Sequence, residues 1–180
     1  VIESFKRRYL AKFGGPLPVF LPEAVIMAVQ PLQQEYDFEG FHAPIVQFQE
    51  TGVAYPGTLE LAQPAVYSVL DFTQPVDQLI AWEGSMLVEK SGTLNALRFV
   101  TKNVLAVVQE HATTIDWLNH YMTLPLYEPI KVKAGDLLRL SFAYRAGGSI
   151  PSLQASIQTR IVNDHAVEQV AELAELAEFA

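Results

Sequence analysis

The chain has 180 residues, of which 50% are hydrophobic and 18% are charged, a balance typical of a globular protein and not of a disordered one. The formal net charge of −8, with 12 Lys and Arg residues, argues against nucleic-acid binding, which requires a basic surface. Cysteine is absent, which excludes disulfides, thiol nucleophiles and thiolate metal sites.

The first third of the chain predicts a helix followed by strands. Residues 1–19 are expected to form a short helical and linker segment, because the paired glycines Gly14 and Gly15 and the prolines after them cannot continue a helix. The apolar run 24–30 lies between prolines, which favours a buried strand. Residues 33–44 are polar and aromatic, typical of a loop or peripheral arm, and residues 45–49 indicate a short edge strand.

The middle of the chain is the richest in strand patterns. Residues 65–72 predict one strand, and residues 79–88 predict another that bends at Gly84. Residues 93–109 are too long for a typical strand, which indicates two. A helix over this range stays open, because Leu94, Leu97, Val100 and Val104 would share one face, but its β-branched residues favour strands.

The stretch 112–144 is expected to contain strand, turn, strand, a turn at Gly135-Asp136, and a strand whose apolar residues recur with period two. Apolar and polar residues also alternate over 153–161, which predicts an amphipathic strand. From Asp164 the period becomes helical, so residues 163–180 predict a C-terminal helix that either flanks the body or mediates association.

These elements indicate an all-β fold: a closed or partly open barrel or sandwich of about nine or ten mostly antiparallel strands with short N-terminal and C-terminal helices. We divide the chain into an N-terminal helical and linker segment (1–19), a β-barrel domain (20–162) and a C-terminal helix (163–180). No apolar run is long enough to cross a membrane and no signal peptide is recognisable, so we expect a cytoplasmic protein. The chain begins with Val1 and not Met, which suggests a processed product or a piece of a longer protein.

Motifs for autonomous chemistry are missing from the sequence. There is no G-x-S-x-G nucleophile motif, and His42, His111, His120 and His165 lack metal-binding spacing. Glycine-rich phosphate loops are absent as well. We therefore predict no catalytic residue, metal site or cofactor site within this chain.

One polar and aromatic cluster remains as a candidate substrate-facing site: Asp116, Trp117, Asn119 and His120. On a continuous strand, Asp116 and His120 would share one face, and Trp117 and Asn119 the other. A Trp beside an acid can form the wall of a pocket for a cationic side chain. The alternative is that Trp117 is a core residue whose polar neighbours cover an edge.

The order of several short motifs resembles the β-barrel half of protein arginine methyltransferases. These motifs are Thr-Ile-Asp-Trp-Leu-Asn-His-Tyr (114–121), Leu124-Pro125-Leu126, Pro129-Ile130, Val132 and Gly135-Asp136, with Leu21-Pro22-Glu23-Ala24-Val25 and Ala28-Val29-Gln30-Pro31-Leu32 upstream. The resemblance covers about residues 20–162. It implies a barrel that walls a substrate groove, while an S-adenosylmethionine-binding domain, in cis or in trans, supplies the cofactor and the catalytic glutamates.

The resemblance also implies a homo-oligomer formed through an arm, for which residues 35–58 are the nearest candidate. One departure concerns the substrate: the family has His before Trp in this loop, and this chain has Asp116 before Trp117. Asp116 favours a cationic substrate by charge without specifying arginine. We thus expect an accessory, substrate-presenting and oligomerisation domain acting on a protein or peptide. The alternative is a free-standing, jelly-roll-like binding module for a small molecule, glycan or protein surface.

Overall fold

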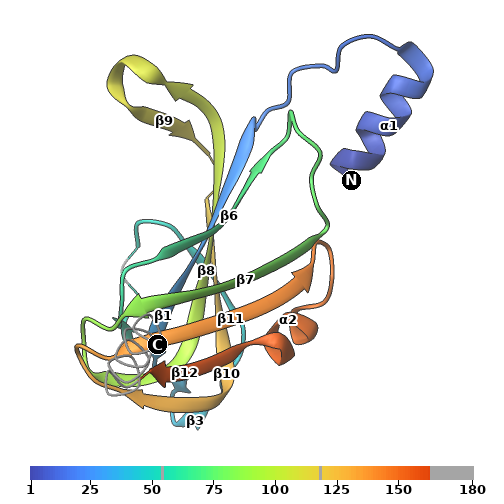
Figure 1. Cartoon of the computed structure of the whole chain (residues 1–180). Coiled ribbons are helices and arrows are strands. Elements are labelled where there is room, and N and C mark those ends of the chain that lie inside the picture. Colours follow the sequence, from blue (N-terminus) through green and yellow to red (C-terminus); the bar gives the residue numbers. More distant parts are fainter. Residues whose placement is uncertain (54, 118, 163–180) are drawn as a thin grey trace, which may run out of the picture.

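Antiparallel strands dominate the computed structural model, which describes residues 1–53, 55–117 and 119–162 (Figure 1). The strands are β1 (Ala24–Gln34), β2 (Asp37–Phe38), β3 (Phe41–His42), β4 (Gln47–Glu50), β5 (Thr58–Glu60), β6 (Ala65–Asp71), β7 (Leu79–Leu87), β8 (Gly92–Val108), β9 (Thr113–Asp116), β10 (His120–Val132), β11 (Leu137–Arg145) and β12 (Gln158–Val162). The helices are α1 (Ile2–Phe13), α2 (Ile150–Ser156) and the 3-10 turn η1 (Gln109–His111). The predicted all-β class is confirmed, and the strand number exceeds the expected nine or ten because several strands are very short.

The larger sheet has seven strands in the order β4-β10-β8-β1-β5, with β6 also pairing β1 and β9 also pairing β8. The strand β8 is one continuous element of 17 residues, so the expectation of two strands over this range was wrong. Its first part pairs with β10, whereas the part from Val104 onward pairs with β9. Because of this change of partner, the first part of β8 lies within the sheet and its last part forms, with β9, the β8–β9 arm (residues 104–116) that extends from the sheet (Figure 1).

The smaller sheet has the order β12-β11-β7 and packs against the larger one. The period-two pattern of β11 is confirmed, because Leu138, Leu140 and Phe142 are buried. They pack in one core cluster with Leu97 and Leu124 of the larger sheet, both fully buried. Burial of this apolar surface between the two sheets is the main source of stability.

The predicted turn between β10 and β11 is also present. Gly135 has a φ of +93°, a conformation that glycine adopts without steric cost. The carboxylate of Asp136 accepts a hydrogen bond of 2.7 Å from the backbone N–H of Lys133. Both residues therefore act in the way their sequence pattern indicates.

The strand expected over residues 153–161 is present in its second part as β12, but the expectation was wrong for its first part, which belongs to helix α2. The Ser149 hydroxyl caps this helix by accepting a hydrogen bond from the Ser152 N–H, and Pro151 lies in the first turn. Leu153 is buried in the core. Residues four apart share a helical face as well as a strand face, so the alternation did not distinguish the two structures. Only Gln158–Val162 forms a strand.

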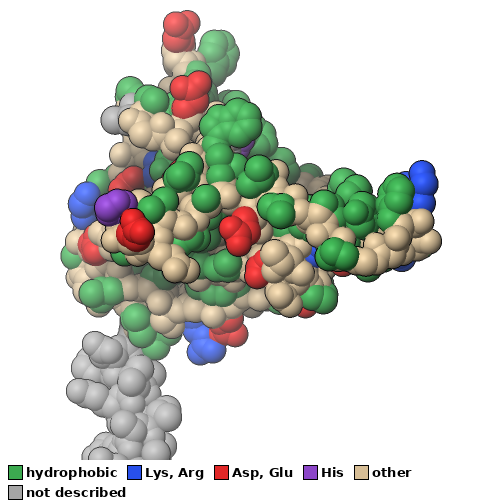
Figure 2. All heavy atoms as spheres, turned by 90° about the horizontal axis from the view of Figure 1, so that it is seen from above, with side chains coloured by type: hydrophobic (Ala, Val, Ile, Leu, Met, Phe, Trp, Pro, Cys, Tyr) green, Lys and Arg blue, Asp and Glu red, His purple; other side chains and the backbone are tan. Residues whose placement is uncertain are grey.

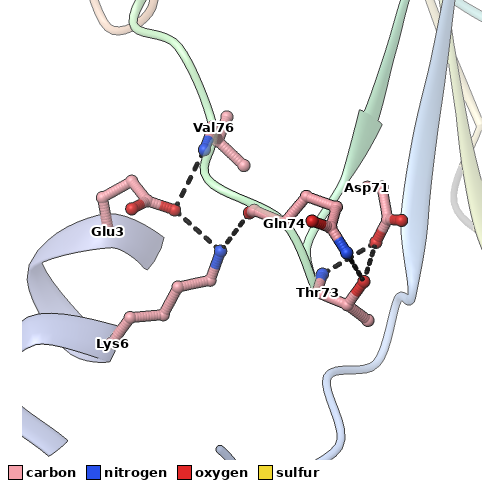
Figure 3. Close-up of polar contacts among 6 residues, drawn as sticks. All are labelled: Glu3, Lys6, Asp71, Thr73, Gln74 and Val76. Atoms are coloured by element: carbon pink, nitrogen blue, oxygen red, sulfur yellow. Dashed lines mark hydrogen bonds and ion pairs between the residues drawn. The ribbon is translucent and has the colours of Figure 1, made fainter. Parts of the chain in front are cut away.

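The helix α1 is predicted correctly and projects from the body (Figures 1 and 2). Figure 3 shows how Glu3 and Lys6 reach the loop after β6, where they contact the backbone of Gln74 and Val76. Phe5, Tyr9 and Phe13 lie one helical turn apart, with ring centroids separated by 5.8 and 5.1 Å. Phe13 is 65% exposed, so the helix presents aromatic surface to its surroundings.

The proposed division at residues 19 and 162 stays a prediction, and the C-terminal helix predicted over 163–180 lies outside the described residues. Neither α1 nor α2, the α-helices of the described ranges, is long and apolar enough to cross a membrane.

Candidate functional site

The predicted site residues lie at the edge of the seven-stranded sheet, and they do not share one face of it. Asp116 pairs with Val104 on the face of Lys102, whereas His120 pairs with Thr101 on the face of Phe99. Side chains alternate along β8, with Leu97 and Phe99 in the core cluster and Arg98 and Lys102 on the opposite face. In the antiparallel register, Tyr121 of β10 lies opposite Val100 and therefore shares the face of Arg98. This face therefore carries Arg98, Lys102 and Tyr121 together with apolar residues such as Val100 and the buried Val104.

Asp116, Trp117 and Asn119 come together where the β8–β9 arm joins this sheet. Asp116 ends β9, and the Asn119 side-chain amide donates a hydrogen bond to its carboxylate. The Lys102 ammonium lies 3.5 Å from the other carboxylate oxygen of Asp116. The short connection is further held by the Asn103 backbone, which donates to the Asn119 side chain at 3.2 Å and accepts from the Trp117 N–H at 3.1 Å.

These bonds show that Asp116 and Tyr121 do not belong to one continuous strand, as the alternation argument had assumed. β9 ends at Asp116 and β10 begins at His120. The prediction that Asn119 faces away from Asp116 was therefore wrong, because the turn brings their side chains into contact. The Asn119 side chain accepts a hydrogen bond from the Asn103 backbone N–H of β8, so at this position a side chain takes the place of a strand backbone as the partner of β8.

The surroundings of Asp116 stabilise its carboxylate in the ionised form. The hydrogen bond from Asn119 lowers the pKa of Asp116, with a smaller contribution from the nearby Lys102 charge. Both interactions favour the ionised form. At neutral pH the residue before Trp117 in the chain therefore carries an anionic side chain.

Trp117 is 63% exposed, so the alternative that it is a core residue was wrong. Trp82, the second tryptophan, is partly buried and packs against the core residue Phe142. His120 is exposed at the start of β10, where its backbone pairs with Glu50 of β4 and Thr101 of β8. An exposed tryptophan beside a charged acid is suited to binding and adds nothing to the core.

Sequence reasoning missed a second polar feature, which lies on the same sheet face as Lys102. Arg98 is 7% exposed and bonds to Gln30 of the adjacent strand β1 and to Glu60 of β5, one strand further along the sheet. The sequence does contain one sign of this feature, because Arg98 is the single charged residue between Gly92 and Thr101. Charged side chains on a buried strand require partners, and such partners are visible only when the strands are assembled.

Among the described residues, no group of three or more His, Cys, Asp or Glu side chains could hold a metal ion.

No protein-family model matches the chain, and no curated protein matches it. One similar solved structure is a chain of the Trypanosoma brucei PRMT1 enzyme–prozyme heterotetrameric complex with AdoHcy. The TM-score is 0.46 and the sequence identity 13%, over 77% of this chain and 53% of that chain. The match therefore spans about half the length of that chain.

Proposed function

We propose that this chain is an accessory β-barrel domain of an S-adenosylmethionine-dependent methyltransferase, where it presents a cationic protein or peptide substrate and supports oligomerisation. The order of motifs from Leu21 to Asp136 supports the assignment, because it resembles the barrel half of arginine methyltransferases. The cofactor and the catalytic groups belong, in this proposal, to a partner domain in cis or in trans.

The observation that carries the substrate-presenting role is that the exposed Trp117 directly follows Asp116, whose carboxylate is held in its ionised form. A cationic side chain stacked on the indole would gain ring-face attraction and the charge of the carboxylate together. Lys102 competes for Asp116 at 3.5 Å, but its own side chain is 38% exposed and can move aside. Asn119 keeps the carboxylate in place during such an exchange.

Binding of a short arginine-containing peptide to this chain, followed by NMR, tests the substrate-presenting role. The Trp117 indole N–H resonance should shift saturably, and Asp116→Asn should weaken binding about threefold or more. The chain offers a matched control in Trp82 and Glu83, another adjacent tryptophan and acid, whose acid pairs with Arg139 on the smaller sheet. Glu83→Gln should leave the affinity unchanged. Equal affinity in Asp116→Asn and wild type would remove Asp116 from the site.

The oligomerisation role is supported by the surface of the segment 35–58. Its exposed large hydrophobic residues in the described range are Phe38, Phe41, Ile45, Phe48 and Val53. Phe41 is 77% exposed and Phe48 is 72% exposed, so self-association would remove substantial apolar area from water. Sedimentation analysis should detect a dimer that Phe41→Ser and Phe48→Ser together abolish. A wild-type chain that stays monomeric at high micromolar concentration would contradict this role.

The alternative is a free-standing binding module that uses the same Trp117 and Asp116 surface. Methyl transfer from labelled S-adenosylmethionine to the arginine-containing peptide separates the two. With an S-adenosylmethionine-binding partner domain present, transfer should depend on this chain and fall in Trp117→Ala. Peptide binding without any effect of this chain on transfer would favour the binding module.

A further inference from the structure

The guanidinium of Arg98 is buried on the outer face of the larger sheet with part of its donor capacity unused. Its Nη1 group donates at 2.9 Å to the Gln30 side chain and at 2.6 Å to the Glu60 carboxylate. Within the described residues its Nε group is buried and has no partner. The Tyr121 ring covers the guanidinium, with 5.0 Å between the ring centroid and Cζ. A buried cation with an unused donor is costly, which points to a missing acceptor.

A cavity of about 390 Å³ opens beside this guanidinium. Its wall includes Tyr55, Leu59, Glu60, Lys90, Arg98 and Tyr121. The volume lies within the range of small-ligand pockets. The cavity therefore has a buried polar floor, aromatic walls and room for a molecule of several heavy atoms.

The charges around the cavity do not cancel. Glu60 neutralises Arg98 by direct contact, but Lys90 is exposed and its ammonium has no hydrogen bond or ion pair to any described residue. The Tyr55 hydroxyl accepts a hydrogen bond of 2.7 Å from the Glu50 N–H, which leaves its own proton to donate. The cavity thus combines excess positive charge with hydrogen-bond donors, in a chain whose net charge is −8.

We propose that this cavity binds a small molecule through its carboxylate, held between Arg98 and Lys90. A guanidinium matches a planar carboxylate better than it matches other anions, because its donors form a fork. Glu60 occupies part of that fork in the structure, yet its side chain is 53% exposed. The ligand displaces Glu60 toward solvent or takes the remaining donors beside it. Tyr55 and Tyr121 then flank the body of the ligand.

Two-dimensional NMR of the full chain, titrated with malonate at constant ionic strength, tests the proposal. Saturable shifts are expected at the amides of Tyr55, Lys90 and Tyr121. Lys90→Met should weaken malonate binding about fivefold, and Arg98→Gln about tenfold or more. The matched control is Arg139→Gln, which removes an arginine paired with Glu83 on the other sheet and should change nothing.

The variant Glu60→Gln distinguishes an anion site from a cation site by the direction in which the affinity changes. It also avoids the folding risk of replacing a buried arginine. It removes the competing carboxylate while keeping an amide oxygen for Nη1, so malonate should bind several-fold tighter. A cation site would instead lose affinity in this variant and would bind methylammonium. Tighter binding in Glu60→Gln, lost in Lys90→Met, supports the proposal. Non-saturable malonate shifts, weaker binding in Glu60→Gln, or stronger binding of inorganic phosphate than of malonate would each overturn it.

Discussion

The ammonium of Lys6 donates a hydrogen bond of 2.6 Å to the backbone carbonyl of Gln74, which joins the N-terminal helix to a loop 68 residues further along the chain. The same ammonium lies 2.7 Å from the Glu3 carboxylate, and the carboxylate accepts a bond of 3.2 Å from the Val76 N–H (Figure 3). The Lys6 side chain is only 8% exposed. These contacts hold α1 at its position on the body.

Replacing Lys6 by Met should release α1 without unfolding the sheets. Loss of the charge-assisted bond to Gln74 should lower the free energy of local opening by about 1–2 kcal/mol. Hydrogen exchange of the α1 amides measures this directly, while the exchange of β8 amides should stay unchanged. Arg7→Met, on an exposed position of the same helix, is the control. Equal α1 protection in Lys6→Met and Arg7→Met would contradict the role of Lys6.

Attachment of α1 should also weaken in acid. The hydrogen bond from Lys6 lowers the pKa of Glu3, so Glu3 stabilises the docked helix above the ordinary glutamate pKa and loses this effect as pH falls through the lowered value. We expect constant Phe5 and Phe20 ring shifts between pH 7 and 5 and a change below about pH 4. Glu3→Gln should remove this change.

A second carboxylate near α1, that of Asp71, also has a lowered pKa, so the acid transition needs a separate control for it. The hydroxyl and backbone N–H of Thr73 lower the pKa of Asp71 at the start of the same loop. Asp71→Asn therefore isolates the contribution of Glu3. An acid transition of α1 that persists in Glu3→Gln and disappears in Asp71→Asn would assign the effect to the loop.

The packing of the two sheets should depend strongly on Leu124. This residue of β10 is fully buried in the main core cluster, so Leu124→Ala should lower the free energy of unfolding by about 3 kcal/mol through lost burial and a cavity. Urea denaturation measures the change. Leu87→Ala is the matched control, because Leu87 is 61% exposed, and it should stay within about 0.5 kcal/mol of wild type. Similar costs at both positions would contradict the described core.

The turn between β10 and β11 should be sensitive to backbone conformation and insensitive to added volume. Gly135 has a φ of +93°, and a Cβ placed there would meet no atom within 4 Å. Gly135→Ala should therefore cost about 1 kcal/mol from strain alone, as measured by thermal unfolding. Ala134→Ser, at the neighbouring exposed position, should be neutral. A cost above about 3 kcal/mol at Gly135 would indicate a steric clash and a different turn.

Several features of the candidate site required tertiary contacts to be recognised. Trp117 is exposed and Trp82 is partly buried against the core, although both lie next to an acid in the sequence. At the break between β9 and β10, the Asn119 side chain donates a hydrogen bond to Asp116 and accepts one from the backbone N–H of Asn103 on another strand. Local alternation contains no information about such cross-strand partners, so it placed Asp116 and Asn119 on opposite faces.

The sequence by itself determined the elements whose causes are local. Gly14 and Gly15 end α1, Gly135 and Asp136 form a turn, and the period-two run after them forms β11. Only the tertiary structure decided where Lys6 and Arg98 lie and whether residues 150–156 are helical. The physical reason is that turns and periodicity depend on neighbouring residues, whereas burial of a charge depends on partners such as Gln74 and Glu60 that the fold brings from distant strands and loops.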